Sequence, residues 1–560
     1  MNKKKELSTE QALELAQKAA DAGKKEKAEK YYNAILNKYP ENQDAIHGIK
    51  ALNPNTLFRS DLDELKAELE DKKFRDVEVR SKMYLDLYPE VFELYHYLGI
   101  ALSNQNKHGE ALPVLKKAAR LNPNDADVQF HLGTSFFRQR DFKRSIVCYK
   151  KTVELSPEYG EAHFQAGNAF FELKDFKNSL EAYEIAIKFF PKSLNVLSNM
   201  ADCYYSMGNH KEAIKLFEQL LEQTDKKAVI YNKIGDVQLV SGQFNDAIAT
   251  YAKAIESDPS IMEFHIKQAD VHKIKGDYEA AIKKYEDVLS NDVNNPVSIA
   301  NLSVLNHLLG HDDKSKEYLE KLDDNLFMNL PNVVSKQFCG SYKRFMTKLL
   351  EFKENSKSKT SKKLKKIWAF GGDNALSLKG QQATFEGQNY EFDAKWTVND
   401  RALLIAQSGS GVFKLSINHQ FSKFEKGTNV LLAFGSNDFI PSALFLQDVK
   451  NNFDNISKSV TGLATGYFNN SLAMVREHEL NPIYVSIPAP VVDVNIDGAK
   501  EVSVLIQQFN AELKKLCDGE KVTYVDLFSF TDNGDGCADQ SKYLEGIRLL
   551  PTAIGDALAQ

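Results

Sequence analysis

The chain has 560 residues, 43% of them hydrophobic and 26% charged, and its formal net charge is −6. A chain of this length and composition is expected to fold into several globular domains, and its small, mixed charge provides no broad basic surface for nucleic acid. No apolar run reaches the ~18 residues of a membrane-spanning helix, so no membrane span is predicted.

The first 42 residues are predicted to form one N-terminal helical repeat. Ser8, with Gln11 three residues later, is the pattern of a capping box that starts a helix, and no apolar signal-peptide core accompanies it. Ala28, Tyr32 and Pro40 stand in the same phase as the repeats that follow. Residues 43–91 keep the length of a further repeat but lose most of this pattern, so they are predicted to be an irregular helical connection.

A 34-residue period governs the next part of the chain. Prolines stand at 89, 123, 157 and 191, and the same phase continues through Asp225 to Pro259. Small residues recur at two fixed distances before each of these anchors, and they allow two antiparallel helices to approach closely. A proline then ends the second helix of each pair. Bulky residues that would fill the gap to the next repeat recur at Leu115, Tyr149, Tyr183, Phe217, Tyr251, Tyr285 and Leu319.

This pattern resembles the tetratricopeptide repeat (TPR), in seven repeats over residues 92–329. The resemblance implies an all-α solenoid whose first helices line a groove for an extended peptide or a partner helix. Residues 330–352 are predicted to form a helix that caps the last apolar face. Aromatic residues in the middle and acidic residues later in the array indicate a partner with some basic character. The residues expected in the groove are His96, Phe130, Phe137, Phe164, Asn168, Phe171, Asp202, Tyr205, Asn232, Asp236 and Asp270.

An alternative applies to several of these phenylalanines, which are equally well explained as packing between helices. Beyond the array, residues 353–366 are rich in lysine and serine and are predicted to be a flexible linker. Residues 367–560 then alternate apolar runs with amphipathic helical stretches. This alternation predicts an α/β domain with a five-stranded parallel sheet of the flavodoxin-like kind. The predicted strands are 367–370, 402–407, 429–435, 482–490 and 522–528.

Polar turns follow these strands in a fixed order: GGDN at 371–374, SGSG at 408–411, GSND at 435–438 and, late in the chain, LEGIRLLP at 544–551. The order resembles that of the SGNH (GDSL-type) hydrolases and acyl-esterases. In that family a serine follows the first aspartate, glycine amides and an asparagine form the oxyanion hole, and a late histidine is the base. The resemblance therefore implies oxyanion-donor positions at Gly409 or Gly411 and at Asn437.

The catalytic positions of that family are occupied by other residues in this chain. After Asp373, the nucleophile position is Asn374, while Arg548 stands at the base position and Glu545 at its carboxylate partner. Asparagine cannot form an acyl-enzyme, and a permanently protonated arginine cannot act as a general base. His419 and His478 stand in no matching motif, and Ser377, one helical turn past the nucleophile position, is the alternative nucleophile.

What remains is a pocket rich in hydrogen-bond donors, formed by Asn374, Gly409, Gly411, Asn437 and Arg548. Such a pocket favours an anionic small molecule or a glycan over ester cleavage. A pocket that binds nothing is the alternative. The stretch DNGDG at 532–536 is predicted to be a turn, because Thr531 and Lys542 fall at the first and last calcium-ligand positions of an EF-hand loop.

The sequence therefore favours a binding protein over an enzyme. We expect a protein-interaction scaffold with a TPR groove, joined to an SGNH-like domain that acts as a second binding module. The alternatives are an SGNH-type esterase or acyltransferase acting on a glycan, and a glycan-binding module. We expect neither a cofactor nor a metal. The five scattered cysteines, without CxxC spacing, indicate a reducing cytoplasm.

Overall fold

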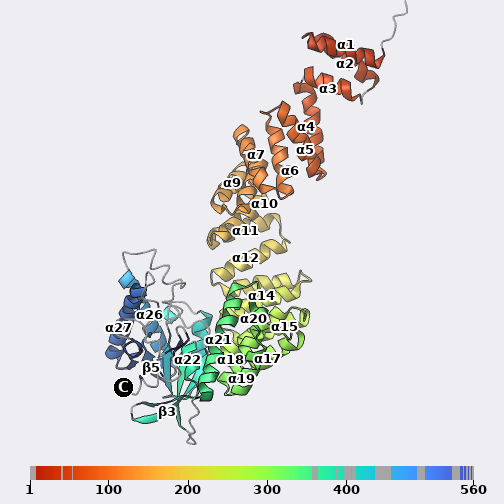
Figure 1. Cartoon of the computed structure of the whole chain (residues 1–560). Coiled ribbons are helices and arrows are strands. Elements are labelled where there is room, and N and C mark those ends of the chain that lie inside the picture. Colours follow the sequence, from red (N-terminus) through yellow and green to blue (C-terminus); the bar gives the residue numbers. More distant parts are fainter. Residues whose placement is uncertain are drawn as a thin grey trace, which may run out of the picture. The chain divides into compact units, whose positions relative to one another are not determined.

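The computed structural model is drawn in Figure 1 with its helices and strands labelled. The chain consists of two compact units, Met1–Leu216 and Phe217–Gln560. The structure describes residues 8–39, 42–52, 54–328, 330–355, 364–371, 373–385, 387–396, 405–406, 411–434, 456–488, 499–532, 543–545, 548–549, 553 and 557.

Unit 1 consists of paired helices. Side chains at helix N-caps accept backbone hydrogen bonds, as Asp125 does from the Val128 N–H and Asp175 from the Asn178 N–H, which fixes where α8 and α11 begin. The helices are α1 (Thr9–Asp21), α2 (Lys25–Lys38), α3 (Gln43–Leu52), α4 (Pro54–Glu70), α5 (Phe74–Leu87), α6 (Phe92–Asn104), α7 (His108–Leu121), α8 (Ala126–Arg138), α9 (Phe142–Leu155), α10 (Gly160–Glu172), α11 (Phe176–Phe189), α12 (Leu194–Ser206) and α13 (His210–Leu221), in which the division falls.

Small residues face the bulky ones where the paired helices cross. A Cβ added to Gly133 would lie 2.8 Å from a ring carbon of Tyr149, and one added to Gly167 would lie 2.5 Å from Tyr183. Both tyrosines are buried. Larger residues at these glycines would therefore push the two helices of a pair apart.

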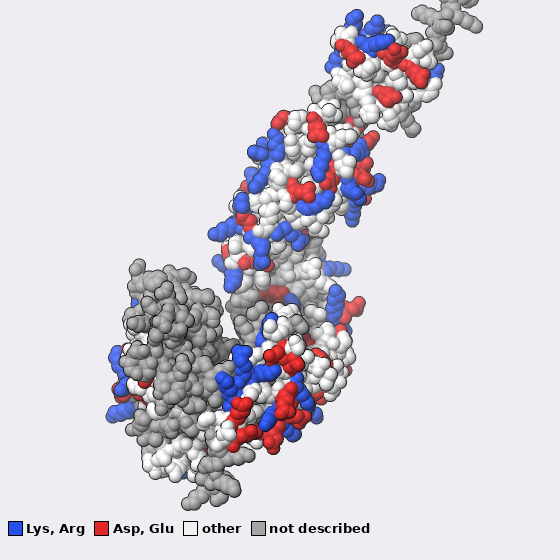
Figure 2. Space-filling view, viewed as in Figure 1, with Lys and Arg blue, Asp and Glu red and all other residues white. Residues whose placement is uncertain are grey.

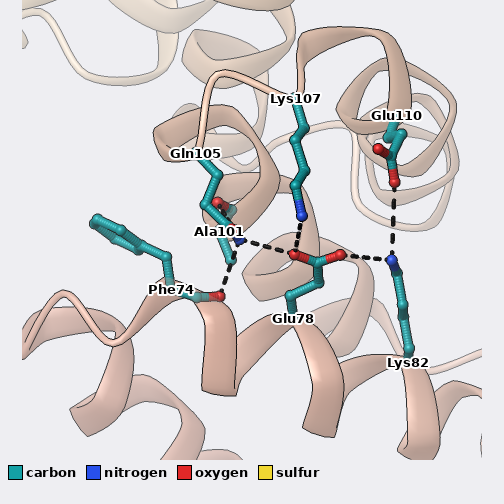
Figure 3. Close-up of polar contacts among 7 residues, drawn as sticks. All are labelled: Phe74, Glu78, Lys82, Ala101, Gln105, Lys107 and Glu110. Atoms are coloured by element: carbon teal, nitrogen blue, oxygen red, sulfur yellow. Dashed lines mark hydrogen bonds and ion pairs between the residues drawn. The ribbon is translucent and has the colours of Figure 1, made fainter.

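A charged cluster joins α5 to the turn between α6 and α7 (Figure 3). Glu78 on α5 accepts hydrogen bonds from Lys107 at 2.7 Å, Lys82 at 2.6 Å and Gln105 at 2.9 Å. Gln105 also donates to the carbonyl oxygen of Phe74 at 3.2 Å. Glu78 is only 7% exposed, so its carboxylate depends on these donors in place of water.

Unit 2 begins with further helix pairs and ends with a sheet that is covered by helices. The pairs repeat the packing of unit 1, since a Cβ on Gly235 would lie 2.7 Å from Tyr251. The helices are α14 (Lys227–Val240), α15 (Phe244–Ser257), α16 (Met262–Lys275), α17 (Tyr278–Asn291), α18 (Pro296–Leu308), α19 (Asp312–Lys321), α20 (Asp324–Met328), α21 (Val333–Asn355), α22 (Asp373–Leu378), α24 (Val412–Phe421), α26 (Ile456–Glu477), α27 (Ala499–Glu520) and α28 (Leu527–Thr531).

The sheet has six strands in the order β2-β3-β1-β4-β5-β6, and it is mixed. β2 pairs with β3 in antiparallel fashion, while β3, β1, β4, β5 and β6 all run parallel to one another. A separate antiparallel pair is formed by β7 and β8. The strands are β1 (Lys365–Gly371), β2 (Gln382–Phe385), β3 (Gln388–Trp396), β4 (Asn429–Ala433), β5 (Asn481–Val485), β6 (Thr523–Val525), β7 (Tyr543–Glu545) and β8 (Arg548–Leu549).

This sheet corrects the prediction in two places. The purely parallel five-stranded sheet is wrong, because the antiparallel strand β2 makes it a mixed sheet of six. The predicted strand 402–407 is not a strand in its described part, since Ile405 and Ala406 are helical. The strand that pairs with β1 on that side of the sheet is β3. The sequence QNYEFDAKW of β3 alternates polar and apolar residues, so the pattern of continuous apolar runs does not predict this strand.

Within unit 2, the helix pairs and the sheet share a hydrophobic core. Leu376 of α22 and Ala394 of β3 belong to the same buried cluster as Leu305 of α18 and Leu349 of α21. Lys395 extends between two aromatic rings, 5.0 Å from the centroid of Tyr278 and 5.2 Å from that of Trp368. Burial lowers the pKa of Lys395. The α/β part therefore packs directly on the last helix pairs.

Helix α24 adds a second attachment, to the turns between paired helices. Ser416 donates a hydrogen bond to the carbonyl oxygen of Ile274, at the end of α16, over 2.5 Å. Leu415 packs on the turn before α15 so tightly that a Cβ on Gly242 would lie 2.8 Å from its Cδ1 atom. The serine thus satisfies a carbonyl group that the end of a helix leaves without an intrahelical partner.

Charges of both signs are interspersed over the described helices on the face shown in Figure 2. Within the described ranges, no helix has the length and apolarity needed to cross a membrane.

Candidate binding face on the first helices of each pair

We call the first helix of each repeat from residue 92 onward the A helix and the second the B helix. In unit 1 the A helices are α6, α8, α10 and α12, and α8 contacts both α6 and α10, while α10 also contacts α12. In unit 2 they are α14, α16 and α18. A helices that adjoin in this way form one continuous face within a unit, and every residue predicted for the groove lies on an A helix.

The predicted aromatic residues of unit 1 are half-buried and pack on neighbouring rings. Phe130 on α8 stacks on Tyr159, with the ring centroids 5.1 Å apart. Its counterpart one repeat later, Phe164, lies 5.8 Å from Tyr183. Phe137 contacts the ring at the start of its own B helix at 5.3 Å. Phe171 repeats this contact one repeat later, also at 5.3 Å. These rings therefore hold helices together while keeping part of their surface exposed.

An amide network continues this face over α10 and α12. Asn168 accepts a hydrogen bond from the Tyr183 hydroxyl at 2.6 Å and another from the Asn199 amide at 2.9 Å. The Asn168 amide nitrogen donates in turn to Gln165 at 3.1 Å. Asp202 is half-buried one repeat after Asn168. Tyr205 is also half-buried, with its ring 6.3 Å from that of His210.

The acidic residues of unit 2 are compensated by lysines of the same chain. Lys267 donates to Asp236 at 2.9 Å and to Asn232 at 3.0 Å. Lys273 donates to Asp270 at 2.5 Å. The acidic character predicted for this part of the face is therefore largely neutralised before a partner arrives.

A ladder of tyrosine hydroxyl groups was missed by the sequence analysis. In each of four repeats the B-helix tyrosine donates to the A-helix residue 15 positions earlier: Tyr149 to Thr134 at 3.3 Å, Tyr183 to Asn168 at 2.6 Å, Tyr251 to Asp236 at 2.6 Å and Tyr285 to Asp270 at 2.5 Å. The sequence pattern predicts only that these tyrosines fill the gap between repeats. Phe217 stands at the same position in the repeat of Asp202 and has no hydroxyl group.

The predicted pocket of the α/β part lies mostly outside the described residues. Gly409 and Asn437 are not described. Asp373 and Asn374 begin α22, Glu545 ends β7 and Arg548 begins β8, but their side chains are not described. Gly411 is the N-cap of α24. The turn DNGDG is described only at Asp532.

The backbone nevertheless brings two of the predicted turns to adjacent strands. β1 and β4 are parallel neighbours, with Gly371 opposite Ala433. A Cβ on Gly371 would lie 2.6 Å from the Ala433 carbonyl oxygen, so this position requires glycine. Asn374, at the start of α22, follows β1 in the chain, and Asn437 follows β4 in the sequence but lies outside the described residues. The described parts of β1 and β4 therefore end side by side at the same edge of the sheet.

The structure shows the surroundings of three other candidate catalytic residues of this part. Ser377 is 1% exposed within α22. His478 is hydrogen-bonded to Asn418 over 2.9 Å. His419 lies on α24 with its ring 5.6 Å from that of Phe244.

Comparison with known proteins identifies the repeats. Family models of the tetratricopeptide repeat match residues 11–42, 96–160, 131–194, 192–260 and 232–296. Helical pairs with this match are tetratricopeptide repeats, a fold that indicates a scaffold for protein–protein interaction. No curated protein sequence matches the chain.

Among solved structures, the chain is similar to YrrB, described as a TPR protein with an unusual peptide-binding site, at 20% identity over 33% of this chain and 95% of that one, with a TM-score of 0.31. A MamA structure is 23% identical over 29% of this chain and 96% of its own, with a TM-score of 0.27. MamA from Desulfovibrio magneticus RS-1 is 18% identical over 30% and 96%, with a TM-score of 0.29.

Proposed function

We propose that the protein is an interaction scaffold that holds an extended segment of a partner protein on the A helices of unit 1. The supporting observation is that Phe130 and Phe164 occupy equal positions on consecutive, adjoining A helices and keep part of each ring exposed. Half-exposed aromatic rings beside amide groups are the usual anchors of such contacts. Because lysines compensate Asp236 and Asp270, we assign most of the binding energy to this aromatic and amide surface.

A peptide library displayed on phage and selected against the full-length protein tests this proposal. We expect enriched sequences to bind the wild type, and to bind the double variant Phe130→Ala/Phe164→Ala at least ~30-fold more weakly, as loss of a binding hot spot of about 2 kcal/mol requires. Val147→Ala is the matched control, since Val147 is an apolar residue on the B helix α9 and is 66% exposed. Equal binding by the double variant and by the control would refute the assignment.

For the α/β part we propose a degenerate SGNH-like domain that serves as a second binding module. The order of its parallel strands, β3-β1-β4-β5-β6, is that of the flavodoxin-like arrangement, and the turns of Asn374 and Asn437 follow the central pair β1 and β4. With asparagine and arginine at the nucleophile and base positions, we propose binding of an anionic small molecule or a glycan. Capture of the partner by the array should then survive Asn374→Ala.

Residual esterase or acyltransferase activity on a glycan is the second candidate for this part. It predicts hydrolysis of p-nitrophenyl esters and covalent labelling by a fluorophosphonate. The burial of Ser377 argues against that serine as a replacement nucleophile. A pure glycan-binding module instead predicts thermal stabilisation by a saccharide that is lost in Arg548→Ala. No stabilisation across a glycan panel would contradict it.

We place the protein in the cytoplasm. Cys148, Cys203, Cys339 and Cys517 are free and buried, which suits a reducing compartment.

A further inference from the structure

Three metal-binding side chains converge at the start of the A-helix face in unit 1. His96 comes from α6, Asp125 is the N-cap of α8 and Asp127 lies in the first turn of α8. One ligand atom from each of the three residues lies within 4.8 Å of the others. Among the described residues, these three form the one cluster of histidine, cysteine or carboxylate side chains that is close enough to hold a metal ion.

An independent feature of His96 points to a ligand at this place. The residue is only 9% exposed, and its Nε2 atom has no hydrogen-bond partner. That atom lies 4.0 Å from Oδ1 of Asp125, which is too far for a hydrogen bond. A buried nitrogen without a partner is costly, because folding has removed it from water and replaced it with nothing. The His96 ring also packs on two aromatic rings, with its centroid 5.4 Å from that of Phe92 and 5.6 Å from that of Tyr97.

Each of the two carboxylates also accepts a hydrogen bond from its surroundings. Asp125 accepts from the Val128 N–H at 2.9 Å, which leaves lone pairs of its carboxylate available. Asp127 accepts from the Tyr159 hydroxyl at 2.9 Å. A tyrosine that orients a carboxylate in this way is the kind of outer partner that tunes metal ligands.

We propose that His96, Asp125 and Asp127 bind a divalent transition-metal ion of the zinc type. One imidazole nitrogen and two carboxylate oxygens are ligands that Zn²⁺ accepts, and the two negative charges would balance the charge of the ion. Bond lengths of about 2.1 Å in a tetrahedral site place ligand atoms about 3.4 Å apart. Because the ligand atoms are up to 4.8 Å apart, the three side chains must close by up to about 1.4 Å. The exposed side chain of Asp127 can supply that movement.

Three protein ligands leave a fourth position open on the A-helix face. A water molecule, or a donor atom of a bound partner, would complete the coordination. This site does not depend on the peptide-binding proposal, because metal binding can be measured without a partner.

Titration of the metal-free full-length protein with Zn²⁺ by calorimetry, and with Co²⁺ by visible absorption, tests the proposal. We expect one equivalent to bind to the wild type. Asp127→Ala and His96→Ala should weaken this binding by at least about tenfold, and Tyr159→Phe by about 10- to 100-fold. His163→Ala is the matched control, because its ring contacts the Pro157 carbonyl oxygen at 3.3 Å and belongs to the next repeat.

Loss of the equivalent in Asp127→Ala and its retention in His163→Ala would support the site. Asp127 is exposed, so this variant should fold even if truncation of the buried His96 disturbs α6. The absence of a stoichiometric equivalent in the wild type would overturn the proposal. So would an affinity that Asp127→Ala leaves unchanged.

Discussion

Replacing Glu78 by glutamine removes the charge at the centre of the cluster that fastens α5 to the α6–α7 turn (Figure 3). Hydrogen bonds from Lys107 and Lys82 lower the pKa of Glu78 from 4.5 to about 2. At ~1.4 kcal/mol per pH unit, this difference corresponds to about 3 kcal/mol. Because Lys82 is 50% and Lys107 40% exposed, solvent screening reduces the expected loss to about 1–2 kcal/mol.

Hydrogen–deuterium exchange of the full-length protein measures this loss locally. A destabilisation of about 1–2 kcal/mol should speed amide exchange in α5 and in the first turn of α7 by about 5- to 30-fold at pH 7. Glu110→Gln is the matched control, since Glu110 is 61% exposed and lies 3.8 Å from Lys82, so we expect no measurable change. Exchange rates in Glu78→Gln that match those of Glu110→Gln would refute the reasoning.

The pH dependence of the same cluster follows from the direction of the shift. Since the pKa of Glu78 is lower in the folded state, its contribution to stability is complete above pH 4.5 and is lost as the pH falls from 4.5 through about 2. The difference in exchange between the wild type and Glu78→Gln should therefore shrink in samples incubated at acid pH.

Three further predictions concern single contacts. Gly371→Ala should destabilise the sheet by about 1–3 kcal/mol in thermal unfolding, because the new methyl group would clash with a backbone carbonyl group. The control Gly462→Ala lies in an open position on α26 and should be neutral or stabilising. Equal effects of the two substitutions would contradict this reasoning. Ser416→Ala should speed amide exchange at the end of α16 by an amount equivalent to about 1 kcal/mol, and unchanged exchange would argue against the contact of α24 with that helix. Tyr285→Phe removes a hydrogen bond to a carboxylate and should lower the local stability of its repeat by about 1.5–3 kcal/mol. Tyr149→Phe removes a hydrogen bond to a hydroxyl group and should lower it by about 0.5–1.5 kcal/mol. Amide exchange in each repeat measures both losses, and a larger loss in Tyr149→Phe would contradict this prediction.

The repeat array was predictable because its packing rule is local in sequence. The 34-residue period places Gly133 and Gly167 against Tyr149 and Tyr183, and the structure confirms the close contact of each pair. The hydroxyl ladder was not predictable in this way, because tyrosine and phenylalanine fill the same gap and only the structure shows which oxygen faces each hydroxyl group. The same holds for Asp236: the sequence predicts a negative charge that could bind a basic partner, and only the structure shows that Lys267 already pairs with it.

The α/β part was predicted less well for a different reason. Continuous apolar runs predicted β1, β4 and β5, which lie inside the sheet, and β6, which lies at its edge. β3 alternates polar and apolar residues, and the run at 402–407 is apolar without being a strand in its described part. Apolar content alone cannot separate a buried strand from a short buried helix, so the prediction placed a strand at 402–407 and none at β3. The attachment through α24 depends on residues about 140 positions apart and leaves no periodic signal.

The most direct test of the scaffold function is hydrogen–deuterium exchange of the full-length protein with and without a peptide selected from the displayed library. If the partner lies on the A helices, the peptide should slow exchange in α8 and α10 and leave the B helices α9 and α11 unchanged. Slowed exchange confined to α9 and α11, or to the α/β part, would contradict that account.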